Sequence, residues 1–184
     1  STNYTGDGYT VAVLDTGVES NHTMLNGKVV AEACFNTNYS APGFITESRC
    51  PGGATSSTAA GSAADCDPAV WEGCGHGTGV ASIAAGVTTP VTDGGGFNEV
   101  LSGVAKDASI LGINVFSKVT SVEACGDTDP CVLSLSSDQF AALDYIISLA
   151  SAGTLPSPLA AVNMSLGSVV NSTDSQAVCD ADPS

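Results

Sequence analysis

The stretch YTVAVLDTG at residues 9–17 decides the fold class of this chain. Its apolar run, residues 9–14, is short and rich in branched side chains, as is typical of a strand buried on both faces of a sheet. The run stops at Asp15, and Thr16 and Gly17 follow, so we expect the strand to open into a loop there. Asp15 is therefore predicted to lie at the carboxyl end of a buried strand.

Outward from this strand, strand-like and helix-like stretches alternate. We predict further strands at residues 29–35, 109–116 and 159–164, and helices at residues 77–85 and 136–152. Alternation of this kind indicates β-α-β units, which form a parallel sheet covered by helices. The predicted fold class is therefore α/β, with no internal repeat and no domain linker.

The second predicted helix carries its own signals. Ser136 and Gln139 have the spacing of a capping box at its start. Its apolar stripe at helical spacing consists of Phe140, Leu143, Ile147 and Ala150. We expect this stripe to face the sheet.

The charge balance excludes some classes of partner. The chain has 4 Lys and Arg residues against 19 Asp and Glu residues, a net charge of −15. Nucleic acids and anionic lipids both require a basic face, so neither is an expected partner. No apolar run approaches the roughly 20 residues of a membrane span.

Seven cysteines and few lysines indicate an oxidising, extracellular compartment, so we predict a secreted protein. Six cysteines can pair in about 15 ways, and the sequence alone does not choose among them. Short loops favour Cys66–Cys74 and Cys125–Cys131, which leaves Cys34–Cys50 and an odd Cys179. Four of the cysteines lie in or beside residues 36–75, a Gly/Ser/Pro/Ala-rich stretch that we call the stapled segment. We expect the stapled segment to contain no regular element.

Asp15 and His76 are the candidate chemical groups. Glycines flank His76 at the start of a predicted helix, which allows a tight turn and leaves the imidazole exposed. A buried carboxylate that bonds one imidazole nitrogen lets the other nitrogen act as a general base. The competing interpretations are an ordinary turn at Asp15 and a structural histidine, which is how we interpret His22.

Four blocks of sequence resemble a known family. VAVLDTGV (11–18), GHGTGVAS (75–82), GVA (103–105) and VNMSLG (162–167) resemble, in order, the motifs of the subtilisin-like serine proteases, the subtilases or peptidase S8 family. The resemblance implies a three-layer sandwich with a mostly parallel sheet. It also implies the Asp-before-His order of subtilisin-type triads.

The resemblance assigns roles to particular residues. Asp15 and His76 would be two of three catalytic residues of a secreted serine endopeptidase. Ser165, Leu166 and Gly167 would lie along a polypeptide substrate, with residues 132–135 as the opposite rim. No cofactor is required for such chemistry, and no metal ligand is assigned.

The sequence also departs from the family pattern. Subtilases carry their nucleophile in a downstream Gly-Thr-Ser block, and no Gly-Thr-Ser occurs here. We therefore expect residues 1–184 to form the N-terminal part of a catalytic domain, with the stapled segment as an insertion. The sheet would be incomplete at its C-terminal side, the missing part would be a partner, and the isolated fragment would be inactive. Met24 stands where family members often have a calcium-binding Asp, although the acidic residues 93–99 leave calcium possible and unassigned.

Three alternatives remain open at this stage. A secreted pseudoenzyme or binding module with this fold would also lack the serine. An aspartic protease lobe shares the Asp-Thr-Gly motif, but that fold is all-β and needs a second Asp. Cys66, Cys74 and His76 have the spacing of zinc ligands.

Overall fold

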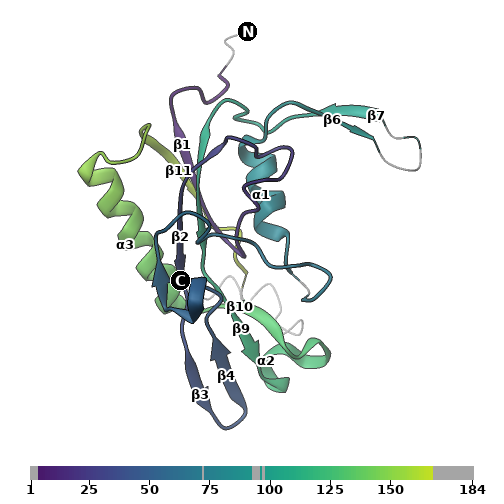
Figure 1. Cartoon of the computed structure of the whole chain (residues 1–184), viewed down its shortest axis with the longest axis vertical. Coiled ribbons are helices and arrows are strands. Elements are labelled where there is room, and N and C mark those ends of the chain that lie inside the picture. The colour runs from purple at the N-terminus through teal and green to yellow at the C-terminus, as the bar shows by residue number, and fades with distance from the viewer. Residues whose placement is uncertain (1–3, 72, 93–95, 97, 168–184) are drawn as a thin grey trace, which may run out of the picture.

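The fold is built around one five-stranded sheet (Figure 1). The computed structural model describes residues 4–71, 73–92, 96 and 98–167. In spatial order the strands are β11 (Leu159–Asn163), β1 (Thr10–Asp15), β8 (Ser109–Asn114), β2 (Val29–Phe35) and β5 (Ser56–Ser57). The first four are parallel, and the short β5 is antiparallel to β2. The prediction of a mostly parallel sheet is confirmed.

Helices cover both faces of this sheet, α1 (His76–Ala85) on one and α3 (Ser136–Ala152) on the other (Figure 1). The alternation of side chains along each strand supplies both cores. On the α1 face, Val13 packs with Ala81, whereas on the α3 face Leu14 packs with Ala142 and Ile146. Complete burial of a Leu or Ile side chain contributes about 1.5–3 kcal/mol. The three-layer α/β architecture is therefore confirmed.

A second sheet corrects the prediction for the stapled segment. Its strands, in spatial order, are β10 (Cys131–Ser134), β9 (Phe116–Thr120), β4 (Phe44–Glu47) and β3 (Tyr39–Ala41), and each pair is antiparallel. The stapled segment thus contributes a regular β3–β4 hairpin, as well as β5. These strands are too short to leave a pattern in the sequence, and pairing with the distant strand β9 stabilises them.

The remaining elements are short. They are η1 (Pro51–Gly53), β6 (Thr89–Thr92), β7 (Asn98–Leu101), α2 (Val122–Cys125) and η2 (Gly126–Thr128). β6 and β7 pair with each other in a separate two-stranded sheet.

The three expected disulfides, Cys34–Cys50, Cys66–Cys74 and Cys125–Cys131, are all present. Two of them close loops within or beside the stapled segment. Cys179 lies outside the described residues.

Helix α3 has the predicted length but not the predicted cap or face. Leu135 is the N-cap and makes no side-chain capping bond, while the Gln139 amide donates to the hydroxyl of Ser134. Phe140 and Ile147 of the predicted stripe are 67% and 62% exposed. Leu143 of the predicted stripe does pack against the sheet core, but the residues of the helix that are buried there are Ala142 and Ile146, because the small Ala142 side chain allows close approach to the sheet.

Strand β11 forms one edge of the main sheet. It pairs with β1 on one side, and no described residue pairs with its other side. Val162 on this strand and Met164 just beyond it are more than a third exposed. Within the described residues the sheet is thus open on the side of its last strand, as expected.

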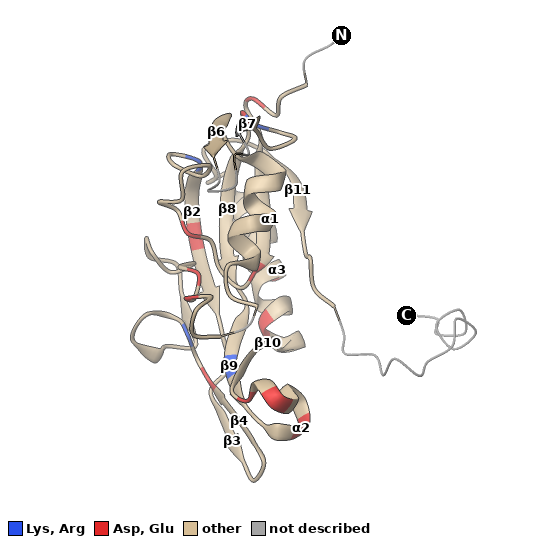
Figure 2. Cartoon of the chain, turned by 90° about the vertical axis from the view of Figure 1, so that its right-hand side faces the viewer, with Lys and Arg blue, Asp and Glu red and all other residues tan. Residues whose placement is uncertain are grey.

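The four basic residues do not form one basic face. Lys28 contacts the backbone of Lys106, and Arg49 and Lys118 line a separate hollow. Figure 2 shows these positions as separate short segments of the chain. In the part of the chain that the structure describes, no helix has the length and apolar character needed to cross a membrane.

Candidate active site

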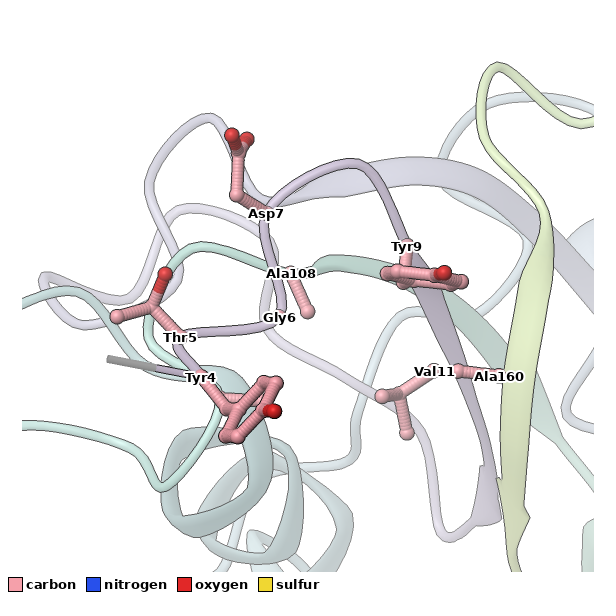
Figure 3. Close-up of a pocket in the computed structure, with 9 residues that line it drawn as sticks. Tyr4, Thr5, Gly6, Asp7, Tyr9, Val11, Ala108 and Ala160 are labelled. Atoms are coloured by element: carbon pink, nitrogen blue, oxygen red, sulfur yellow. The ribbon is translucent and has the colours of Figure 1, made fainter. Parts of the chain in front are cut away.

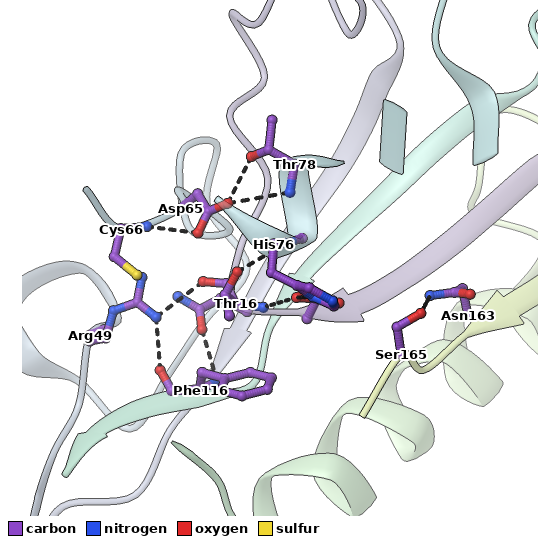
Figure 4. Close-up of polar contacts among 12 residues, drawn as sticks. Thr16, Arg49, Asp65, Cys66, His76, Thr78, Phe116, Asn163 and Ser165 are labelled. Atoms are coloured by element: carbon purple, nitrogen blue, oxygen red, sulfur yellow. Dashed lines mark hydrogen bonds and ion pairs between the residues drawn. The ribbon is translucent and has the colours of Figure 1, made fainter. Parts of the chain in front are cut away.

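Asp15 and His76 meet at the carboxyl end of β1, where Figure 4 shows His76 next to Thr16. Asp15 is the last residue of the strand and is fully buried, and His76 is the first residue of α1. The imidazole Nδ1 lies 2.8 Å from Oδ1 and 3.0 Å from Oδ2 of the carboxylate. Both distances lie within the range of a hydrogen bond.

The backbone around His76 explains how the two residues come so close. Gly75 precedes the helix with a φ of +83°, a left-handed conformation that favours glycine. Gly77 is buried against the strand end, where a Cβ would lie 2.8 Å from the Cβ of Asp15. The start of α1 can therefore pack directly on Asp15 only because residue 77 has no side chain.

Thr16 completes the contact between the two elements. Its backbone N–H donates to Oδ1 of Asp15 at 2.7 Å, and its hydroxyl accepts from the N–H of Gly77 at 3.0 Å. One residue thus orients the carboxylate and also ties the strand end to the helix start. Sequence analysis assigned no role to Thr16, although it lies inside the 11–18 block.

This arrangement prepares the imidazole for acid–base chemistry. The carboxylate accepts from Nδ1–H, so in neutral His76 the lone pair lies on Nε2. The His76 side chain is 51% exposed, whereas Asp15 is fully enclosed. Among the described residues, no hydroxyl is hydrogen-bonded to Nε2, which leaves this nitrogen open to an incoming group.

The predicted substrate-binding residues follow β11. Ser165 is exposed, and its hydroxyl is hydrogen-bonded to the Asn163 amide at 3.0 Å (Figure 4). Leu166 and Gly167 line a groove of about 470 Å³ together with residues 133–136. The structure therefore brings together the two stretches that sequence analysis placed on opposite rims.

Two aromatic residues of this groove were not predicted. Phe44 comes from the β3–β4 hairpin of the stapled segment, and Phe116 begins β9. Because the hairpin was not expected, nothing in the sequence placed Phe44 near Leu166. The groove is apolar at these positions and so suits an apolar side chain.

The stapled segment also supplies polar contacts to the candidate site. Arg49 Nη1 donates to the backbone carbonyls of Thr16 and Phe116, each at 3.1 Å. Asp65 accepts from the Thr78 hydroxyl at 2.7 Å, in the first turn of α1 (Figure 4). Neither residue was predicted from the sequence, because Arg49 is 33 positions from Thr16 and Asp65 is 13 positions from Thr78.

The zinc interpretation is wrong. Cys66 and Cys74 are joined in a disulfide, so neither can act as a thiolate ligand, and His76 faces Asp15. No cluster of three or more potential metal ligands occurs in the ranges that the structure describes. Part of the acidic stretch 93–99 lies outside those ranges.

His22 lies in a turn, where its Nδ1 accepts from the Met24 backbone N–H at 3.4 Å. It is not hydrogen-bonded to Asp15 or His76 within the described structure. A local structural role agrees with this placement.

A separate hollow of about 370 Å³ lies at the other end of β1, away from Asp15 (Figure 3). Tyr9, Val11 and Ala160 are among its lining residues. It contains none of the predicted site residues, so it is not part of the candidate active site.

Comparisons with known proteins agree with the motifs. The sequence profile of the Subtilase family matches residues 6–182. Thermitase from Thermoactinomyces vulgaris is 34% identical over 110 residues, which are 60% of this chain and 27% of thermitase. The chain thus spans about a quarter of the length of this relative.

Proposed function

The chain belongs to the subtilase family, and on this basis we propose that the protein containing it is a serine endopeptidase. The observation that carries the proposal is the contact between the buried Asp15 carboxylate and the half-exposed His76 imidazole. A carboxylate that fixes Nδ1–H and leaves Nε2 free is the arrangement that activates a serine hydroxyl.

In the proposed reaction, Nε2 of His76 takes the proton of a serine hydroxyl as its oxygen attacks the substrate carbonyl carbon. Asp15 stabilises the imidazolium that forms, without itself taking the proton. His76 then gives this proton to the leaving amine, and the C–N bond breaks to leave an acyl-enzyme. A water molecule, deprotonated by His76, then attacks the acyl carbon of the ester. The bond between this carbon and the serine oxygen breaks, His76 returns the proton to the serine oxygen, and the carboxylic acid product is released.

We further propose that the nucleophilic serine comes from a part of the protein other than residues 1–184. Two observations support this: the sequence has no Gly-Thr-Ser, and Nε2 has no hydroxyl partner among the described residues. The edge of β11 that no described residue pairs with offers a surface on which further strands of the same domain can pair. The missing serine segment is therefore the partner that the proposal requires, and the chain without it is expected to be inactive.

The proposed substrate is an extended polypeptide. Its backbone would pair with Ser165, Leu166 and Gly167, and its side chains would enter the groove between Leu166 and residues 133–136. Three disulfides support an oxidising, extracellular location for the protein. No step of this proposal runs through a metal ion, and calcium stays unassigned.

The alternative is a secreted module that keeps the fold and binds polypeptides without cleaving them. The aspartic protease interpretation is wrong, because the main sheet is mostly parallel and covered by helices, and the chain belongs to the subtilase family. The endopeptidase would hydrolyse a bound peptide, whereas the binding module would hold it without hydrolysis.

Hydrolysis of a fluorogenic peptide library by the full-length protein tests the proposal. We expect turnover that falls at least about 10³-fold in both His76→Ala and Asp15→Asn. His22→Ala is the matched control, because it removes the other histidine of the chain and should leave kcat unchanged. Peptide binding without turnover in the wild-type protein would establish the binding module instead.

A further inference from the structure

We propose that Arg49 is a positioning residue for the Asp15–His76 pair, because it locks the Thr16 carbonyl in place from the stapled segment. The inference rests on the proposed function, since it concerns the geometry of the same pair. Arg49 lies outside all four subtilase motifs of this sequence.

The contacts of Arg49 join the loop after β1 to the start of β9, at the same end of the main sheet. Its Nη1 donates to the carbonyl of Thr16, directly after β1, and to that of Phe116, which follows β8. Another bond links the same two regions, because the Val115 N–H donates to the Asp15 carbonyl at 3.1 Å. Two successive carbonyl groups at the end of β1 are thus hydrogen-bonded across to the next strand end. The Asp15 carbonyl accepts directly from Val115, and the Thr16 carbonyl is linked to Phe116 through Arg49.

Arg49 is itself firmly anchored. Its backbone N–H donates to the Asn36 side chain at 2.8 Å, and the next residue, Cys50, is bonded to Cys34 on β2. The guanidinium is partly buried, and it is the only arginine in the sequence. Desolvation by burial lowers the pKa of this group, while the nearby Asp65 carboxylate raises it. Arginine nevertheless stays charged at any physiological pH, so the bonds to both carbonyls are charge-assisted.

Arg49 affects the position of Asp15 and His76 through one residue, Thr16. Thr16 donates from its backbone N–H to the Asp15 carboxylate and accepts at its hydroxyl from Gly77, next to His76. Movement of the Thr16 peptide would therefore misdirect the carboxylate and loosen the start of α1 together. A second contact of the stapled segment with this turn, from the Val18 N–H to the Ala63 carbonyl at 2.6 Å, limits the movement but does not reach Thr16.

Steady-state kinetics of Arg49→Gln in the full-length protein tests the inference. We expect kcat to fall about 10- to 100-fold with KM changed less than about twofold, because Arg49 does not line the substrate groove and contacts only the backbone carbonyl of its lining residue Phe116. Arg49→Lys should recover part of the loss, since an ammonium still donates to carbonyls but lacks the fixed fork. Lys118→Gln is the matched control. It removes a cation from the same hollow as Arg49, where Lys118 pairs with Glu47, and should leave kcat unchanged.

A spectroscopic measurement separates positioning from general stability. The Nδ1–H proton of His76, held by the carboxylate, should give a far-downfield proton resonance in the full-length wild-type protein. We expect this resonance to be lost or broadened in Arg49→Gln, kept in Lys118→Gln and at least partly restored in Arg49→Lys.

Two outcomes would overturn the positioning role. One is a folded Arg49→Gln variant with wild-type kcat and an unchanged resonance. The other is a fall in activity that only follows the fraction of folded protein. If the wild-type protein cleaves no peptide, the proposed function fails. The resonance in wild type and Arg49→Gln still decides whether Arg49 positions the pair.

Discussion

Replacement of Gly77 by alanine should separate Asp15 from His76. A Cβ at residue 77 would lie 2.1 Å from the carbonyl oxygen of Gly17, 2.8 Å from the Cβ of Asp15 and 3.1 Å from its Oδ1. To bring the Gly17 oxygen to the 3.4 Å of ordinary contact, the start of α1 must retreat from the strand end by roughly 1.3 Å. The obstacles include backbone as well as side-chain atoms, so no rotamer change can relieve the clash.

The size of the effect follows from this displacement. Overpacking of a buried site costs about 1–3 kcal/mol of unfolding free energy. A shift of about 1 Å between catalytic groups lowers the rate about 100-fold. Gly77→Ala should therefore be less stable by that amount and should lose most of its kcat.

Gly79 provides the matched control within the same helix. It is exposed, and a Cβ there meets nothing within 4 Å. Gly79→Ala should raise the unfolding free energy by about 0.5–1 kcal/mol, through helix propensity alone, and leave kcat unchanged. Urea denaturation and peptide hydrolysis measure both quantities. A Gly77→Ala protein with wild-type stability and turnover would refute the close packing of α1 on Asp15.

Three further predictions concern other parts of the molecule. Burial raises the pKa of Asp138 in α3, so the folded protein binds this proton more tightly than the unfolded chain, and charged Asp138 costs stability. The unfolding free energy of Asp138→Asn should therefore rise relative to that of the wild type as the pH rises from the usual pKa of Asp through the raised pKa of Asp138. A difference in unfolding free energy that stays constant between about pH 3 and 7 would contradict this. Replacement of Cys34 and Cys50 by serine should lower the unfolding free energy by about 3 kcal/mol, as measured in urea, because the bridge closes a loop across 16 positions. Phe44→Ala should raise KM about tenfold for peptides with an apolar side chain in the groove, and an unchanged KM would remove Phe44 from substrate recognition.

The two central strands of the main sheet, β1 and β8, could be predicted because they are buried on both faces. Such strands stand out as apolar runs, so β1 is found within one residue. β2 is partly exposed, yet its apolar residues still give its observed bounds. The face of α3 could not be predicted in the same way. Phe140 and Ile147 have helical spacing, yet the contact with the sheet is made by Ala142 and Ile146, and packing rather than periodicity decides between the two.

The same distinction applies to the residues of the candidate site. Asp15 and His76 could be found because a strand end and flanking glycines mark them locally. Arg49 could not be found, because it acts on backbone carbonyls of residues 33 and 67 positions away, and a carbonyl acceptor has no sequence signature. Phe44 depends in the same way on a hairpin that forms only by pairing with β9.

Labelling of the full-length protein with a serine-directed phosphonate, followed by peptide mapping, tests the central claim most directly. We expect one labelled serine outside residues 1–184, and no labelling in His76→Ala. The isolated chain of 184 residues should not be labelled at all. A labelled serine within residues 1–184, or labelling that persists in His76→Ala, would contradict the assignment of Asp15 and His76 as the acid–base pair of a serine protease.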